Sequence, residues 1–98
     1  GRETALLFAE QGAKVIATDI NIQTLQELDD IPNIVTFPLD ITSAEQIQAC
    51  VTAHPDINVL MNCAGVVFNG SVLDCTEEQW LTTMNINISA SFRLIKAC

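Results

Sequence analysis

Three polar residues, each placed directly after an apolar stretch, are the first candidates for chemistry in this sequence. Asp19, Asp40 and Asn62 each follow a short run rich in Val, Ile, Leu and Met. Such runs are typical of buried parallel strands, and ligands of parallel sheets bind at the carboxyl ends of the strands. We expect the three residues to lie at one edge of a sheet. Each alone is also explained by an ordinary turn after a core strand.

The spacing of Asp19 indicates a nucleotide contact. Asp19 lies 18 positions after Gly1, and an acid about 20 residues past a glycine-rich turn can accept hydrogen bonds from a ribose. Its charge would repel a 2′-phosphate, and the residues that follow, 20–22, include no Lys or Arg to offset that repulsion. The pattern favours NAD over NADP. A strand-ending Asp that merely starts a turn is the alternative.

Gly1 and Asp40 are candidates for other parts of the same dinucleotide. Gly1 would be the last glycine of a phosphate-binding turn, where a helix N-terminus meets the pyrophosphate. Asp40 can accept a hydrogen bond from an adenine amino group, or serve equally well as a turn or cap residue before Thr42. The series Asp, Asp, Asn at one sheet edge is more specific than any of its members.

Two asparagines, Asn85 and Asn87, lie in an otherwise helical pattern near the end of the chain. Asn disfavours helix interiors because its side chain competes for backbone hydrogen bonds. A kink at this point would release a carbonyl that can hold a water in a proton path. A helix surface that tolerates Asn is the alternative.

The composition excludes several classes of protein. Twelve acidic residues against four basic ones give a net charge of −8, so we expect no nucleic-acid and no membrane-surface partner. The four cysteines form no C-x-x-C pair and there is one His, so we expect no metal site. We expect reduced thiols in the cytoplasm. No apolar run approaches the roughly 18 residues of a membrane span.

Hydrophobic periodicity and turn residues predict alternating helices and strands. The expected elements are a helix over 2–11, a strand over 14–19, a helix over 22–30, a strand over 34–39, a helix opened by a capping box at 42–45, a strand over 57–61 and a last helix opened by a capping box at 76–79. Alternation with short loops indicates α/β class, a partial doubly wound Rossmann sheet of the second to fourth strands with flanking helices. Residues 1–98 would then be a fragment of one NAD-binding domain, marginally stable alone because the central first strand is missing.

Together these residues resemble the classical short-chain dehydrogenase/reductase family. Gly1 resembles the end of its glycine-rich turn, Asp19 its acidic NAD selector and Asp40 the Asp of its D-[IV]-[TS] motif. Asn62-Cys63-Ala64-Gly65 resembles N-[NVC]-A-G, and residues 87–92 resemble N-h-x-[GAS]-x-F.

The resemblance implies roles for these positions. Asn62, Ala64 and Gly65 would stabilise the central sheet beside the adenosine, and Asn87, not Asn85, would be the catalytic Asn. Several short stretches resemble the cytosolic type-2 3-hydroxybutyrate dehydrogenases, a group also linked to 4-oxoproline reduction. That similarity implies NAD as cofactor, a small hydroxy or oxo acid as substrate and a homo-oligomeric parent, a tetramer or a dimer.

The chain departs from the family pattern in one decisive way. The family's Ser and its Tyr-x-x-x-Lys are absent from these residues, and the sequence has no Tyr. Because that Tyr is the general acid/base, we expect the 98 residues alone to be inactive. The alternatives are a non-catalytic chain that binds nucleotide or pairs with other subunits and, with less support, a Rossmann-like methyltransferase.

Overall fold

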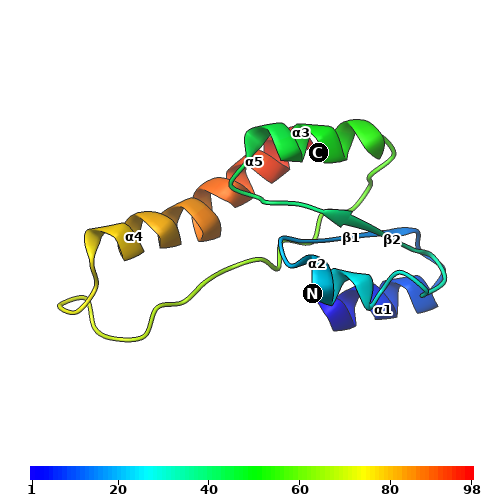
Figure 1. Ribbon diagram of the computed structural model, residues 1–98. Helices are drawn as coiled ribbons and strands as arrows, with labels where there is room; N and C mark the ends of the chain where they lie inside the picture. The colour runs from blue at the N-terminus through cyan, green and yellow to red at the C-terminus, as the bar shows by residue number, and fades with distance from the viewer. The chain divides into compact units, whose positions relative to one another are not determined.

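The structure, a computed structural model, describes residues 1–98. Its elements, labelled in Figure 1, are α1 (Arg2–Glu10), β1 (Val15–Asp19), α2 (Ile22–Gln26), β2 (Ile34–Pro38), α3 (Ala44–Ala53), α4 (Glu77–Met84), the π-helical turn η1 (Asn85–Ser89) and α5 (Ala90–Ala97). The chain divides into two compact units. We call Gly1–Asp40 the N-terminal unit and Ile41–Cys98 the C-terminal unit.

The N-terminal unit contains the only paired strands. β1 and β2 are parallel, in a register that places Val15 opposite Ile34 and Asp19 opposite Pro38. Gly12 lies between α1 and β1 with φ +94°, a conformation that glycine adopts without the steric cost of a Cβ. The α/β class expected from the sequence is confirmed by this parallel pair and the helices that pack on it.

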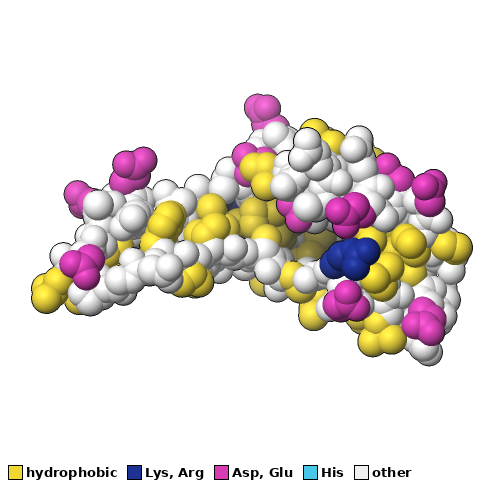
Figure 2. All heavy atoms as spheres, turned by 60° about the horizontal axis from the view of Figure 1, so that its bottom comes forward, with side chains coloured by type: hydrophobic (Ala, Val, Ile, Leu, Met, Phe, Trp, Pro, Cys, Tyr) yellow, Lys and Arg dark blue, Asp and Glu magenta, His cyan; other side chains and the backbone are white.

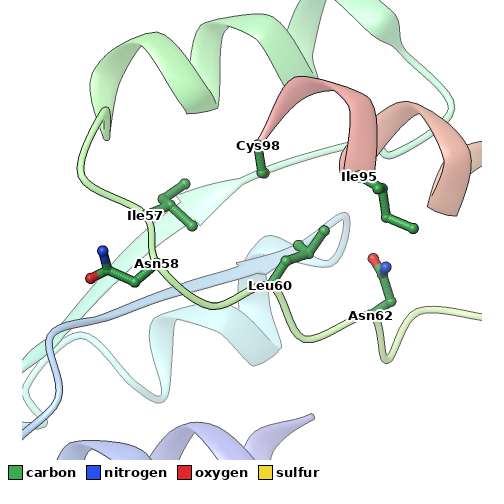
Figure 3. Close-up of a pocket in the computed structure, with 6 residues that line it drawn as sticks. All are labelled: Ile57, Asn58, Leu60, Asn62, Ile95 and Cys98. Carbon is green, nitrogen blue, oxygen red and sulfur yellow. The ribbon is translucent and has the colours of Figure 1, made fainter.

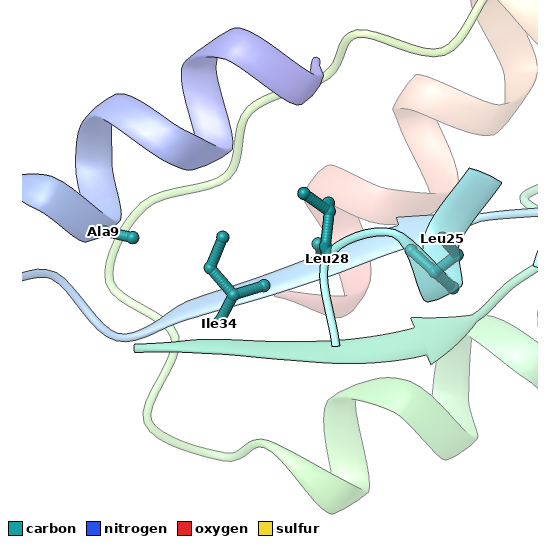
Figure 4. Packing of buried hydrophobic residues seen from close by; sticks show 5 residues of the cluster. Ala9, Leu25, Leu28 and Ile34 are labelled. Carbon is teal, nitrogen blue, oxygen red and sulfur yellow. The ribbon is translucent and has the colours of Figure 1, made fainter. Parts of the chain in front are cut away.

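A small apolar core holds the N-terminal unit together. Figure 4 shows Ala9 of α1, Leu25 of α2, Leu28 of the following turn and Ile34 of β2 gathered at the strand pair. Ala17 of β1 completes the buried cluster.

The second helix begins as expected but is shorter. The side chain of Asn21 accepts hydrogen bonds from the backbone N–H groups of Gln23 and Thr24, at 3.1 and 3.3 Å, and so caps α2. The helix expected over 22–30 ends at Gln26 and continues as turns. Asn33, with φ +67°, then turns the chain into β2.

Helices and an irregular segment make up the C-terminal unit. α3 is capped by Ser43, whose hydroxyl accepts from the N–H of Gln46 at 3.3 Å. The capping box expected to start at Thr42 is therefore placed one residue too early, because the neighbouring Ser caps equally well. The second capping box is confirmed, since Thr76 and Gln79 exchange both of its hydrogen bonds.

The third expected strand is not formed. Residues 57–69 contain neither helix nor strand, and Val59 and Met61 are 68% and 61% exposed. A strand requires a hydrogen-bonded neighbour, and in the Rossmann order 3-2-1-4 that neighbour is the first strand, which these residues do not contain. The apolar sequence of this segment therefore lies exposed here.

The surface carries both acidic and large apolar side chains. Figure 2 shows acidic side chains spread over the visible face, with no single acidic patch. Exposed large apolar side chains are concentrated between Val59 and Ile95. No helix has both the length and the apolarity that are needed to cross a lipid bilayer.

Candidate functional site

The carboxylate of Asp19 lies exposed at the carboxyl end of β1. Its Oδ1 accepts a hydrogen bond from the N–H of Asn21 at 2.9 Å, which orients the side chain. No Lys or Arg forms an ion pair with it. An exposed, oriented carboxylate has further acceptor sites and can accept hydrogen bonds from the two hydroxyls of a ribose.

Arg2, at the start of α1, forms ion pairs with other acidic residues. Its guanidinium lies 3.6 Å from the carboxylate of Glu3 and 3.8 Å from that of Glu27. Both contacts are exposed, so they contribute little to stability. The guanidinium of Arg2 therefore pairs with acidic side chains of α1 and of the turn after α2, and not with Asp19.

Asp40 lies at the same edge of the sheet as Asp19. β1 and β2 are parallel, and Asp40 is half-buried two residues after the end of β2. The backbone N–H of Leu39 donates to the carbonyl of Asp19 at 3.0 Å, which extends the pairing to this point. The structure therefore brings together the first two of the three polar residues.

Gly1 precedes the first turn of α1. Its carbonyl accepts from the N–H of Ala5 at 2.9 Å, and no side chain caps this end of the helix. The free N–H groups of the first turn carry partial positive charge, which suits an anionic ligand. The position agrees with the expected pyrophosphate contact, which remains a prediction.

In the C-terminal unit, the side chain of Asn87 clamps the backbone of Val66. Asn87 Oδ1 accepts from the Val66 N–H at 2.9 Å, and Asn87 Nδ2 donates to the Val66 carbonyl at 2.9 Å. Both bonds are partly buried and join positions 21 residues apart in sequence. One amide thereby fixes the end of the irregular segment against the last helix.

Gly65 fits closely beside this clamp. A Cβ added at Gly65 would lie 3.3 Å from Asn87 Oδ1, closer than ordinary van der Waals contact. A side chain here would push on the atom that accepts from Val66. The small residue at the end of the 62–65 motif is thus explained by a contact with Asn87, a partner that sequence reasoning did not assign to it.

The helix changes geometry where Asn87 lies. Residues 85–89 form a π-helical turn, and the N–H of Ala90 donates to the carbonyl of Asn85, five residues earlier. π-turns are rare in proteins, and those that occur are often found at functional sites. The helix is irregular at the two asparagines, and the release of a carbonyl for a water stays a prediction.

Asn62 and Ala64 are exposed in the irregular segment. Asn62 lines a shallow cavity of about 330 Å³ with Ile95 and Cys98 of the last helix, and Figure 3 shows its amide turned toward Ile95. Asn62, Ala64, Gly65 and Asn87 all belong to the C-terminal unit. The prediction that Asn62 shares an edge with Asp19 and Asp40 stays a prediction.

Sequence reasoning missed two residues of this site. Val66 takes part through its backbone alone, so its residue type carries no signal. Arg93 donates from Nη1 to Oδ1 of Asn85 at 2.9 Å, across the π-turn. The sequence carries no signal for this pair, because residues eight apart do not share a face of a regular α-helix.

Comparison with known proteins gives a consistent result. A family model described as enoyl-(acyl carrier protein) reductase matches residues 1–98. The chain is 48% identical over 97 residues to "Dehydrogenase/reductase SDR family member 6" of Rattus norvegicus, covering 99% of this chain and 40% of that protein. It is also 48% identical over 98 residues to "2-keto-3-deoxy-L-fuconate dehydrogenase" of Xanthomonas campestris, covering 99% and 33%.

A solved structure, serine dehydrogenase from Escherichia coli, is similar in fold. It superposes with a TM-score of 0.90 at 28% identity, over 99% of this chain and 48% of that one. The Rossmann-type fold is thereby confirmed. The chain spans two fifths or less of the length of the two curated relatives above.

Proposed function

Because this chain belongs to the short-chain dehydrogenase/reductase family, we propose that it forms the cofactor-binding part of an NAD-dependent oxidoreductase. Members of the family use NAD or NADP. The observation that carries the choice of NAD is Asp19, an exposed, oriented carboxylate with no basic residue paired to it. A 2′-phosphate placed there would meet an unscreened negative charge.

The other residues of the N-terminal unit have complementary roles in this proposal. Asp19 accepts from the ribose hydroxyls, Asp40 accepts from the adenine amino group, and the α1 N-terminus at Gly1 faces the pyrophosphate. By the family resemblance, we assign Asn62, Ala64 and Gly65 of the C-terminal unit to the adenosine side of the cofactor. Bound NAD supplies a hydride acceptor, and these residues bind and orient it.

Asn87 is the one residue of the chain that we assign to proton transfer. The π-turn around it alters the pairing of amides and carbonyls, so a backbone carbonyl can hold a water molecule in a relay. The side chain of Asn87 is committed to Val66, so the proposed relay uses a backbone carbonyl of the π-turn. The general acid/base of the family lies outside these residues, so the 98 residues alone should not turn over substrate.

A small hydroxy or oxo acid, such as 3-hydroxybutyrate, is the proposed substrate of the parent enzyme, which we place in the cytoplasm. The Xanthomonas relative is named as a dehydrogenase of an oxo acid, which supports this class. Purified residues 1–98 incubated with 3-hydroxybutyrate and NAD should produce no NADH. Measurable NADH would contradict the assignment of the acid/base to residues outside the chain.

The cofactor choice is tested in the full-length protein by Asp19→Ala. We expect the ratio of kcat/KM with NAD to that with NADP to fall at least tenfold, because repulsion of the 2′-phosphate is removed along with the ribose acceptor. Asp30→Ala, which removes an equal charge from an exposed turn of the same unit, is the matched control. An unchanged ratio in Asp19→Ala would remove this residue from the site.

A second role, subunit pairing, is favoured by the apolar face of the last helix. Trp80, Leu81, Ile88, Phe92 and Ile95 are each more than half exposed. We propose that the parent is a homo-oligomer, a dimer or a tetramer, in which this face is covered. Sedimentation of the full-length protein with Phe92→Asp should show smaller species than the wild type, and an unchanged mass would place the interface elsewhere. No observation favours a methyltransferase.

A further inference from the structure

The π-turn is stabilised at two places by side chains. Asn87, in its middle, binds the backbone of Val66, and Asn85, its first residue, accepts a hydrogen bond from Arg93 of α5. Asn85, Asn87 and Arg93 are half-buried. Arg93 forms no ion pair in the structure, so the amide oxygen of Asn85 is the one hydrogen-bond partner seen for its guanidinium.

The geometry of the bond depends on the π-turn. In a regular α-helix, residues eight apart differ by about 80° around the axis, whereas residues seven apart differ by about 20°. The π-turn inserts one residue, so Asn85 and Arg93 acquire the relation of residues seven apart and share a face. Helical side chains lean toward the N-terminus, which directs Arg93 back over the turn. A continuous α-helix would separate the two groups.

We propose that Arg93 is a positioning residue, which holds the π-turn in place through Asn85 and thereby sets the position of Asn87. The consequence reaches the irregular segment, because Asn87 in turn fixes Val66 and lies 3.3 Å from where a Cβ of residue 65 would be. A functional consequence of this inference rests on the proposed role of Asn87 in proton transfer. The positioning itself does not, and it can be measured without turnover.

The test is residue-resolved hydrogen exchange of the full-length protein. In Arg93→Met, which keeps an apolar stem and removes the donors, the Val66 N–H should exchange at least tenfold faster than in the wild type. The amides of β1 should keep their rates. Lys96→Met, which removes an exposed cation from the same helix, is the matched control and should leave Val66 unchanged. Acceleration of all core amides together would show general destabilisation and would overturn the inference.

A second pair of variants breaks the same bond from its other end. Asn85→Leu should reproduce the effect of Arg93→Met, and the double variant should add nothing further. Asn85→Asp keeps the acceptor and should retain the slow exchange of Val66. The Asn85 variants test whether this hydrogen bond positions Asn87 even if Arg93→Met fails to fold. Fast Val66 exchange in Asn85→Asp, or slow exchange in Asn85→Leu, would overturn the inference.

Turnover separates this inference from the proposed function. We expect kcat of Arg93→Met to fall about tenfold with an unchanged KM for NAD, and Asn85→Asp to preserve kcat. Faster Val66 exchange with normal kcat would support the positioning and contradict the role of Asn87 in proton transfer. A lower kcat with unchanged Val66 exchange would overturn the positioning and leave the proposed function standing.

Discussion

Each of the two units is stabilised internally by a different kind of interaction. In the N-terminal unit, five buried apolar residues pack around a parallel strand pair. In the C-terminal unit, the buried residues are Ile47, Cys50 and Ala90, and the irregular segment is held to the last helix by the amide of Asn87. Apolar packing thus stabilises the N-terminal unit, whereas directed hydrogen bonds fix the candidate site in the C-terminal unit.

The difference indicates which changes each unit should tolerate. An apolar core responds to lost volume wherever it occurs, and neighbouring side chains relax only in part. A clamp of two hydrogen bonds responds to small displacements of its atoms and to lost acceptors, while apolar changes nearby matter less. The predictions below break one unit or the other, in order of decreasing effect.

The largest effect is expected from Ile34→Ala in the core of the N-terminal unit. Ile34 is 7% exposed, and truncation of a buried Ile costs roughly 2–5 kcal/mol. Urea denaturation of the full-length protein, together with exchange of the β1 amides, measures the loss. Val35→Ala, at a position 42% exposed in the same strand, should cost far less. Equal losses in the two variants would show that this core does not stabilise the unit.

Substitution of two glycines distinguishes the cost of backbone strain from the cost of a side-chain contact. Gly12→Ala should cost about 1 kcal/mol because φ is +94°, although its Cβ would meet nothing within 4 Å. Gly65→Ala should cost a similar amount through contact with Asn87 Oδ1 at 3.3 Å. Only the Gly65 variant should accelerate exchange of the Val66 N–H. If Gly12→Ala did the same, the clamp would not be specific to Gly65.

A smaller effect is expected at the buried thiol of the C-terminal unit. Burial, and to a lesser extent the neighbouring Cys98, raises the pKa of Cys50 above its ordinary value of 9.0. The folded protein therefore holds this proton more tightly than the unfolded chain. The stability that this provides is present below pH 9.0 and is lost as the pH rises through the raised value.

Alkylation measures the same property of Cys50. At pH 8 the exposed thiols of Cys63 and Cys75 should react with iodoacetamide before Cys50, as followed by mass spectrometry. Equal rates at all three thiols would show that α3 opens readily. Faster reaction of Cys50 than of Cys63 would contradict the direction of its pKa shift.

The sequence predicted local structure well where local rules decide it. The capping box at Thr76 and both paired strands follow from short-range chemistry and periodicity. The strand expected over 57–61 failed because strand formation depends on a partner that local sequence does not describe.

The candidate site shows the same limit. Asn87 stood out because Asn disfavours a helix interior, but its partner Val66 acts through backbone atoms that every residue type possesses. The link between Arg93 and Asn85 depends on the π-turn, which no simple periodicity encodes. Long-range partners and local changes of helix type therefore required the structure.

The most direct test of the account is the turnover of the full-length protein with Asn87→Ala. The change keeps the backbone carbonyl of residue 87 but removes the side-chain clamp on Val66 that fixes the π-turn. We therefore expect the relay to be misplaced and kcat to fall on the order of 100-fold, while the KM for NAD stays within threefold. Asn58→Ala, an exposed Asn of the same unit, is the control and should retain wild-type rates. A kcat for Asn87→Ala within threefold of the wild type would contradict the assignment of Asn87 to the reaction.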